Sequence, residues 1–76
     1  MNFVDIVKEI LKTHIPGSKV DVIPNGKGFD IEVSARTFSK MERADREALV
    51  YMGLQSLPLE LVAKITGIKC VVEGRK

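Results

Sequence analysis

The sequence predicts a small α+β domain in the order α-β-β-α-α-β, with a three-stranded mixed sheet and helices packed on one face. Three observations lead to this prediction. An apolar stripe at helical spacing opens the chain, two alternating segments flank an Asn-Gly turn, and two helical segments precede a last alternating segment. A length of 76 residues fits a single domain, residues 1–76.

The first helix is expected to begin after Asn2, whose side chain can cap it, and to end before Pro16-Gly17. Its apolar residues recur at helical spacing: Phe3, Ile6, Val7, Ile10 and Leu11. This stripe predicts about three turns lying on a core.

A hairpin follows, because residues 19–24 and 29–33 alternate between apolar and polar side chains. Asn25-Gly26 between them favours positive φ at both central positions of a tight turn, a strong hairpin signal. A one-residue slip would bury Asp30 and Glu32, so the pattern specifies the register.

The stretch 33–54 contains the helix around which the rest of the chain is organised. Ser39 and Glu42 have the spacing of a capping box, which predicts a helix from Lys40 to about Leu57. One side is expected to pack on the sheet: Met41, Ala44, Ala48 and Met52. The second half is apolar nearly all round, which predicts a lid on another side, made by Leu61, Val62 and Ile65.

Pro58 and Gly67 bound the third helical segment, since proline favours the first turn and glycine the position after the last. The last strand is expected over residues 68–73, with Cys70 facing the core, and residues 73–76 are expected to fray. A strand reached through helices returns parallel to its neighbour, which makes the sheet mixed.

Composition favours a soluble, cytoplasmic protein. Cys70 is the only cysteine, so no internal disulfide can form, which fits a reducing compartment. The start of the chain lacks the basic flank of a signal peptide, and no apolar run could span a bilayer. The net charge is +2, and residues 64–76 carry four basic side chains against Glu73. This mildly basic end favours a solubilising role over a nucleic-acid-binding stripe.

Two single residues have both a structural and a functional interpretation, and a third has a structural one. Cys70 is expected to behave as a small core hydrophobe, with a metal ligand as the alternative. His14 is expected to interact with the end of the first helix, with metal binding as its alternative. Tyr51 is expected to lie in the core with its hydroxyl tethered.

Charged residues crowd the start of the central helix. The simpler interpretation is a solvated face with the i,i+4 pairs Glu42–Arg46 and Arg43–Glu47. The rival interpretation is a phosphate-contacting face formed by Arg36, Lys40, Arg43 and Arg46. Catalysis is not expected, because His14 is the only candidate base and the glycines around Lys27 form no phosphate-binding loop.

The spacing of Phe38, Arg43, Arg46, the pair Val50-Tyr51 and Leu54 resembles the BolA-like family, over nearly the whole chain. This resemblance implies a fold similar to the type II KH domain and a non-enzymatic adaptor. Such adaptors pair with a monothiol glutaredoxin, share a 2Fe–2S cluster with it, and act in iron–sulfur or stress-related regulation. Some members are described as DNA-binding regulators, which is the alternative function here.

The chain departs from the family at the cluster ligands. Aligning the last strands without a gap places Lys64, or Ala63 after a one-residue shift, where the family has a ligand histidine. Residues 24–28 contain neither the histidine nor the cysteine of the family's hairpin loop, and Cys70 is the one candidate metal ligand. Candidate residues for a protein or nucleic-acid partner are Arg36, Lys40, Arg43, Arg46, Lys64 and Lys69. The chain has no GxxG loop of KH type, and we expect a monomer or a weak homodimer.

Overall fold

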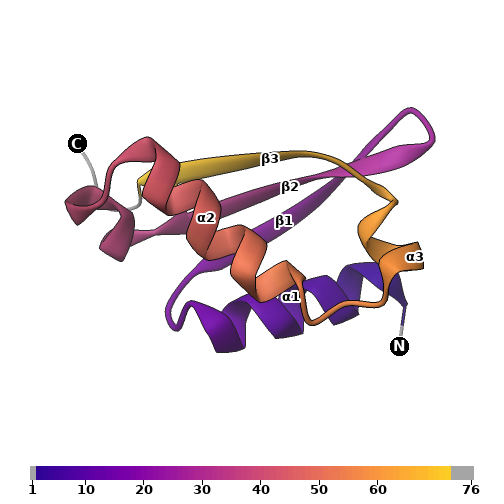
Figure 1. The fold of residues 1–76 in the computed structure, drawn as a ribbon, viewed down its shortest axis with the longest axis horizontal. Coiled ribbons are helices and arrows are strands. Elements are labelled where there is room, and N and C mark those ends of the chain that lie inside the picture. Colours follow the sequence, from indigo (N-terminus) through magenta and orange to yellow (C-terminus); the bar gives the residue numbers. More distant parts are fainter. Residues whose placement is uncertain (1, 73–76) are drawn as a thin grey trace.

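The computed structural model describes residues 2–72 and has the predicted α+β order of elements (Figure 1). The elements are α1 (Phe3–His14), β1 (Lys19–Asn25), β2 (Gly28–Ala35), the 3-10 helix η1 (Arg36–Lys40), α2 (Arg43–Leu54), α3 (Leu59–Val62) and β3 (Ile65–Val72). No helix in this part of the chain combines the length and apolar character needed to cross a membrane.

The sheet has the strand order β1-β2-β3, with β1 antiparallel and β3 parallel to β2, so the predicted mixed sheet is confirmed. Val20 pairs with Val33 in the β1–β2 register, and both side chains are buried. The expected inward face of the hairpin is therefore correct. A bulge separates Phe29 from Asp30 in the pairing with β3.

Helix α1 forms as its pattern predicts. The Asn2 side chain accepts a hydrogen bond from the Asp5 backbone N–H at 2.9 Å, which caps the first turn. Val7 and Leu11 are fully buried on the face that meets the core. The Pro16-Gly17 stop is also confirmed, with Gly17 at a φ of +81°.

The hairpin turn lies one residue later than expected. Asn25 pairs with Gly28, so the two turn residues are Gly26 and Lys27. Gly26 has a φ of +63°, and no described non-glycine residue has a positive φ, which fits a type II′ turn. The prediction of positive φ at Asn25 is wrong. Asn25 stays extended at the end of β1, where its amide donates to the Asp30 carboxylate at 3.0 Å.

Helix α2 begins at Arg43, and the predicted capping box at Ser39 is wrong. Residues 36–40 instead form η1, which carries Phe38 into the core with no exposed surface. Glu42 occupies the N-cap position without a side-chain hydrogen bond. Burial of the Phe38 ring therefore decides where the helix starts, since a fully buried aromatic contributes more than one cap.

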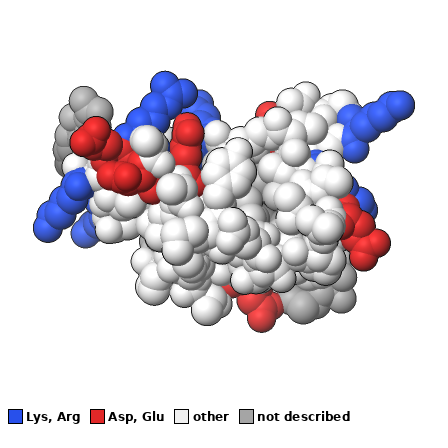
Figure 2. All heavy atoms as spheres, in the orientation of Figure 1, with Lys and Arg blue, Asp and Glu red and all other residues white. Residues whose placement is uncertain are grey.

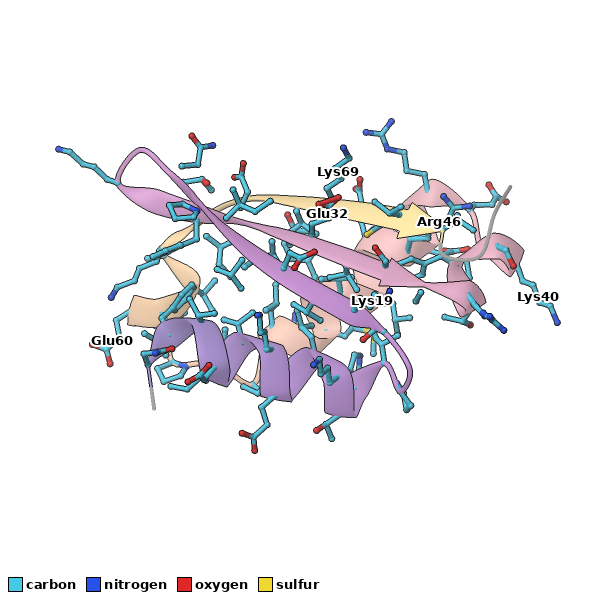
Figure 3. All side chains as sticks on the ribbon, turned by 180° about the vertical axis from the view of Figure 1, so that it is seen from behind. Lys19, Glu32, Lys40, Arg46, Glu60 and Lys69 are labelled. Atoms are coloured by element: carbon cyan, nitrogen blue, oxygen red, sulfur yellow. The ribbon has the colours of Figure 1, made fainter. Side chains whose placement is uncertain are left out.

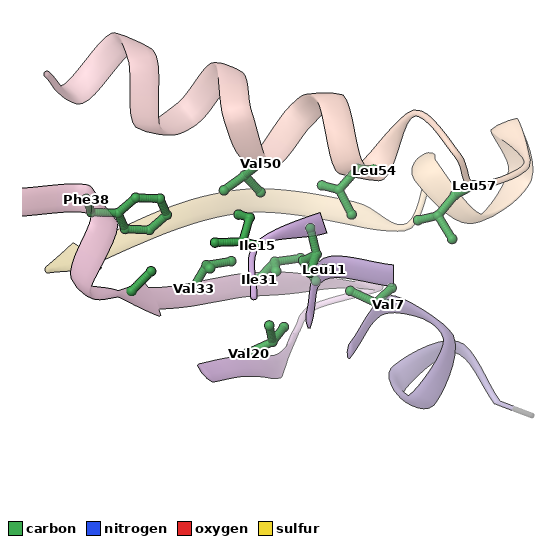
Figure 4. Close-up of a cluster of buried hydrophobic side chains, with 11 residues drawn as sticks. Val7, Leu11, Ile15, Val20, Ile31, Val33, Phe38, Val50, Leu54 and Leu57 are labelled. Carbon is green, nitrogen blue, oxygen red and sulfur yellow. The ribbon is translucent and has the colours of Figure 1, made fainter. Parts of the chain in front are cut away.

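The face of α2 that packs on the sheet also differs from the prediction. Val50 and Leu54 enter the core together with side chains from α1, β1 and β2 (Figure 4). Ala44, Ala48 and Met52 are exposed instead. The physical reason is area, because Val50 and Leu54 bury more apolar surface than two alanines do.

The end of the chain corrects two further boundaries. Helix α2 ends at Leu54, before the predicted Leu57, and α3 is a single turn that ends at Val62. Strand β3 therefore starts at Ile65, before the predicted stop at Gly67. The predicted lid is confirmed in part, since Leu61, Val62 and Ile65 pack against the core cluster. The predictions for Glu73 and for a frayed tail over 73–76 lie outside the described residues.

Candidate interaction surface

Large apolar side chains remain exposed where α2 ends and α3 begins. Tyr51 is 55% exposed, Met52 58% and Leu59 86%. The expectations that Tyr51 lies in the core and that this half of α2 is covered all round are therefore wrong. We call Tyr51, Met52 and Leu59, with the pocket between α2, α3 and β3, the α2–α3 surface. Figure 2 shows that uncharged atoms dominate the middle of the face on which α2 lies.

A pocket of about 280 Å³ lies within this surface. Its apolar lining includes Tyr51, Leu54, Leu59, Val62, Ile65 and Ile68. Gln55 and Thr66 contribute polar atoms at its margin. The pocket exists because α3 is only one turn long and leaves the space between α2 and the start of β3 partly open. A hollow lined mainly by aliphatic side chains suits an apolar group of a partner.

The candidate basic residues do not form one surface. Figure 3 shows Lys40 and Arg46 at the end of the molecule opposite Glu60. Arg36 and Lys40 are exposed on η1, and Arg43 and Lys69 are exposed beside the pocket that Arg46 also borders. Lys64 belongs to the other end, because it precedes β3 and its Nζ lies 6.0 Å from the centroid of the Phe3 ring.

Arg46 has a structural role at that basic end. Its Nε–H is shared between the carbonyl oxygens of Phe38, at 2.9 Å, and Met41, at 3.0 Å. Arg43 and Glu47 form the expected i,i+4 ion pair at 3.4 Å. Glu42 is not a partner of Arg46 among the described contacts, because the guanidinium is turned toward η1. Arg46 thus ties η1 to α2 in place of the predicted surface pair.

Cys70 faces the helices, as its strand position predicts. It pairs with Val33 and is half-buried against the core. It also borders a pocket of about 250 Å³ together with Arg46 and Glu47. Burial raises the pKa of the Cys70 thiol, the Glu47 carboxylate adds to this rise, and the Arg46 guanidinium opposes it. The thiol is therefore protonated at neutral pH, which suits a packing role better than a reactive one.

His14 is the last residue of α1, where the sequence places it, and it packs against α2. A Cβ atom added at Gly53 would lie 2.9 Å from His14 Cδ2, so the ring occupies the space that this glycine leaves. The Nε2 atom is buried and has no hydrogen-bond partner among the described residues. Sequence reasoning missed this contact, and the signal for it was a glycine inside an otherwise helical segment.

The residues at the family's ligand positions do not suit a cluster. Lys64 presents an ammonium group, which has no free lone pair, and its side chain extends toward Phe3. The turn residues Gly26 and Lys27 offer no sulfur or imidazole donor. Within residues 2–72, no three His, Cys, Asp or Glu side chains are close enough together to hold a metal ion.

The geometry defines a helix-backed mixed sheet with an exposed apolar surface between α2 and α3. This fold is BolA-like. BolA1 from Arabidopsis thaliana matches with a TM-score of 0.66 and 18% identity, over 95% of this chain and 90% of that one. A bol-like protein from Babesia bovis matches with a TM-score of 0.64 and 21% identity, over 97% and 88% of the two chains. No family model matches the sequence, and no curated protein matches it.

Sequence reasoning named Tyr51 but assigned it to the core, and it did not single out Leu59. Both lie beside the segment that connects α2 to α3. The available signal was the length of the Pro58–Gly67 segment, because a helix that returns so quickly to a strand cannot bury all of its apolar residues.

Proposed function

We propose that this protein is a non-enzymatic BolA-like adaptor that binds another protein through its α2–α3 surface. The observation that supports this proposal is the exposure of Tyr51 and Leu59 at an apolar pocket, with Met52 exposed next to Tyr51 on α2. Exposed aromatic and aliphatic side chains next to a hollow are the usual anchors of a protein interface. The resemblance makes a monothiol glutaredoxin the partner, in iron–sulfur or stress-related regulation.

In this proposal the adaptor contributes binding and not cluster ligation. Lys64 stands at the position of the ligand histidine, and Cys70 lies further along β3, with the side chain directed at α2. A 2Fe–2S cluster in the complex would therefore take its ligands from the glutaredoxin and glutathione. Binding of the adaptor to the glutaredoxin and ligation of the cluster can therefore be measured separately.

The test is a titration of the ¹⁵N-labelled protein with a monothiol glutaredoxin, with and without iron, sulfide and glutathione. We expect shifts of the backbone signals of Tyr51, Leu59 and Ile65 in both conditions. We also expect the visible spectrum of any cluster to be the same whether or not this protein is added. An unchanged NMR spectrum in both conditions would reject the adaptor proposal. A cluster spectrum that changes with this protein and is lost in Cys70→Ala would contradict the absence of ligation.

Matched variants locate the interface. Leu59→Ser removes an 86% exposed apolar side chain and is expected to weaken glutaredoxin binding roughly tenfold or more, the effect of one well-packed leucine. Ile23→Ser is the control, because Ile23 is a 46% exposed apolar residue on β1, away from α2 and α3. If Leu59→Ser and Ile23→Ser bind the glutaredoxin with equal affinity, the contact does not involve Leu59.

Nucleic-acid binding is a second candidate, which the exposure of Arg36 and Lys40 on η1 and the position of Arg43 and Lys69 beside one pocket favour. Fewer basic side chains are available to phosphates than the sequence suggests, because Arg46 donates to backbone carbonyls. Affinity for a short DNA duplex should fall steeply with salt if phosphates are contacted. Binding that is absent at low salt, or that does not change with salt, would end this alternative.

A further inference from the structure

The two edges of the sheet are protected unequally. Strand β1 forms one edge, and it carries Lys19, Asp21 and Pro24 and packs against α1. Strand β3 forms the other edge, with eight residues, no proline and a single charge at Lys69. Charges, proline and a covering helix are the devices that keep an edge from pairing with another chain. Strand β3 also packs against helical segments, η1 and α2, but Lys69 is its only charged residue and it has no proline.

The register identifies the backbone groups that are free on this edge. Phe29 donates its N–H to the Lys64 carbonyl at 2.8 Å, so the odd-numbered residues of β2 direct their backbone groups at β3. The parallel register pairs Ile31 with Ile68, Val33 with Cys70 and Ala35 with Val72. In a parallel ladder, a β2 residue whose backbone groups point at β3 bonds to the two residues on either side of its paired β3 residue. The N–H and C=O groups of Ile68, Cys70 and Val72 therefore point away from β2.

We propose that this edge pairs with the β3 edge of a second copy of the chain, antiparallel, about a twofold axis at Cys70. Self-pairing about a twofold axis is antiparallel and uses the same surface on both copies. In this register Ile68 of each copy faces Val72 of the other, and the two Cys70 residues face each other. Each such pair exchanges two backbone bonds, about six in total, so the free groups of these three residues are all satisfied.

The charge on the uncovered face of the sheet disfavours the neighbouring register toward the start of β3. With the axis at Cys70, Lys69 lies opposite Val71 of the second copy. Moving the axis by one residue, to Lys69, would place the two Lys69 side chains directly opposite each other, and like charges in that position are destabilising. Moving it by two residues, to Ile68, would place Cys70 opposite Thr66, beside the bulge that interrupts the regular ladder.

The helix side of the sheet carries both signs of charge near the proposed axis. Arg43 and Glu47 of α2 border the same pocket as Cys70, so they lie near that axis. Their side chains form an ion pair at 3.4 Å, and Arg43 is 90% exposed. The twofold axis therefore brings the two Arg43–Glu47 pairs toward each other, and in the proposed contact Arg43 of each copy faces Glu47 of the other. The pocket at the start of β3 shares Ile68 with this contact. The inference uses the backbone of β3 and not that pocket, so it does not depend on the proposed function.

The interface is small, because one strand pair with a few helix contacts buries less than about 1,000 Å². We therefore expect a weak, concentration-dependent dimer. Analytical ultracentrifugation from roughly 20 μM to 1 mM, the range for weak association, should show an apparent mass that rises from 8.4 kDa toward twice that value. Over the same range, the amides of Ile68, Cys70 and Val72 should become protected from hydrogen exchange. The Lys69 amide, which is bonded to β2 in the monomer, should change little.

A charge reversal tests the contact without altering the core. Arg43→Glu should weaken association roughly tenfold, the effect of placing like charges across an interface. Adding Glu47→Arg to that variant should restore association. Lys12→Glu is the matched control, because Lys12 is exposed on α1 and changes the net charge equally. A constant mass of 8.4 kDa at all concentrations would overturn the proposal. Two other results would also overturn it: a dimer that leaves the three amides unprotected, or equal association of the Arg43→Glu and Lys12→Glu variants.

Discussion

Replacing Arg46 by alanine tests whether this arginine is a structural residue or a binding residue. Its Nε–H is held between the carbonyls of Phe38 and Met41, at 2.9 and 3.0 Å. A hydrogen bond from a charged donor contributes about 1.5–3 kcal/mol. The two carbonyls can rehydrate at this half-buried site, which favours the lower part of that range, and the loss of the packed aliphatic stem adds to it. We therefore expect Arg46→Ala to lower the free energy of unfolding by about 2 kcal/mol.

Urea denaturation followed by circular dichroism measures this effect, with the slope m expected to stay unchanged. Thermal denaturation should show a fall of about 8–16 °C in Tm for a domain of this size. Arg43→Ala is the control, because Arg43 is 90% exposed and its i,i+4 ion pair is worth only about 0.2–0.5 kcal/mol. If the two alanine variants are equally stable, the link between η1 and α2 has no energetic importance and the reasoning fails.

Further predictions concern the core and the thiol. Gly53→Ala should destabilise the fold by about 1 kcal/mol in thermal denaturation, because crowding of His14 outweighs the gain in helix propensity. The same substitution in a His14→Ala background should lose that penalty. Phe38→Ala should cost about 3–5 kcal/mol in urea denaturation, since the ring is fully buried. Alkylation of Cys70 should be slow at neutral pH and should rise with a midpoint above that of an unfolded cysteine, because burial raises the pKa of the thiol, and Glu47→Gln should move that midpoint down. A Cys70 midpoint at or below that of the unfolded chain would contradict the burial of the thiol.

The raised pKa of Cys70 also has a consequence for stability. Above about pH 8.5 the unfolded thiol loses its proton while the folded one keeps it. The unfolded state then binds fewer protons than the folded state, so the free energy of unfolding falls as the pH rises. Cys70→Ala should remove this part of the alkaline pH dependence, as measured by urea denaturation between pH 7 and 10.

The sequence predicted the fold class because its segments bury one face each. In β1 and β2 the alternation around Asp30 and Glu32 determines which face turns inward, and that face is the one observed. It leaves the register open, because a shift of two residues keeps each side chain on its face, and the observed turn lies one residue later than expected. In α1 the cap at Asn2 and the stop at Pro16-Gly17 are local chemistry, so both ends were predicted correctly. The wrong predictions concern α2, where two faces of the helix were apolar enough to enter the core.

The choice between those faces depended on residues far away in sequence. Packing against the sheet buries Phe38 in the core. Residues 36–40 form η1 for this reason, so α2 begins only at Arg43. This delay leaves Ser39 without its capping role and turns Arg46 toward backbone carbonyls. No window of neighbouring residues contains this information, because the energy involved comes from packing and not from local propensity.

Local chemistry in the sequence determined the order of elements and the inward side of each strand, since each depends on residues a few positions apart. Only the tertiary structure decided which side of α2 is buried, that Tyr51 and Leu59 are exposed, and that Lys64 and Arg36 lie at opposite ends. These features depend on how much apolar area each side chain buries once the sheet and helices meet. That area is a property of the assembled molecule and not of any single segment.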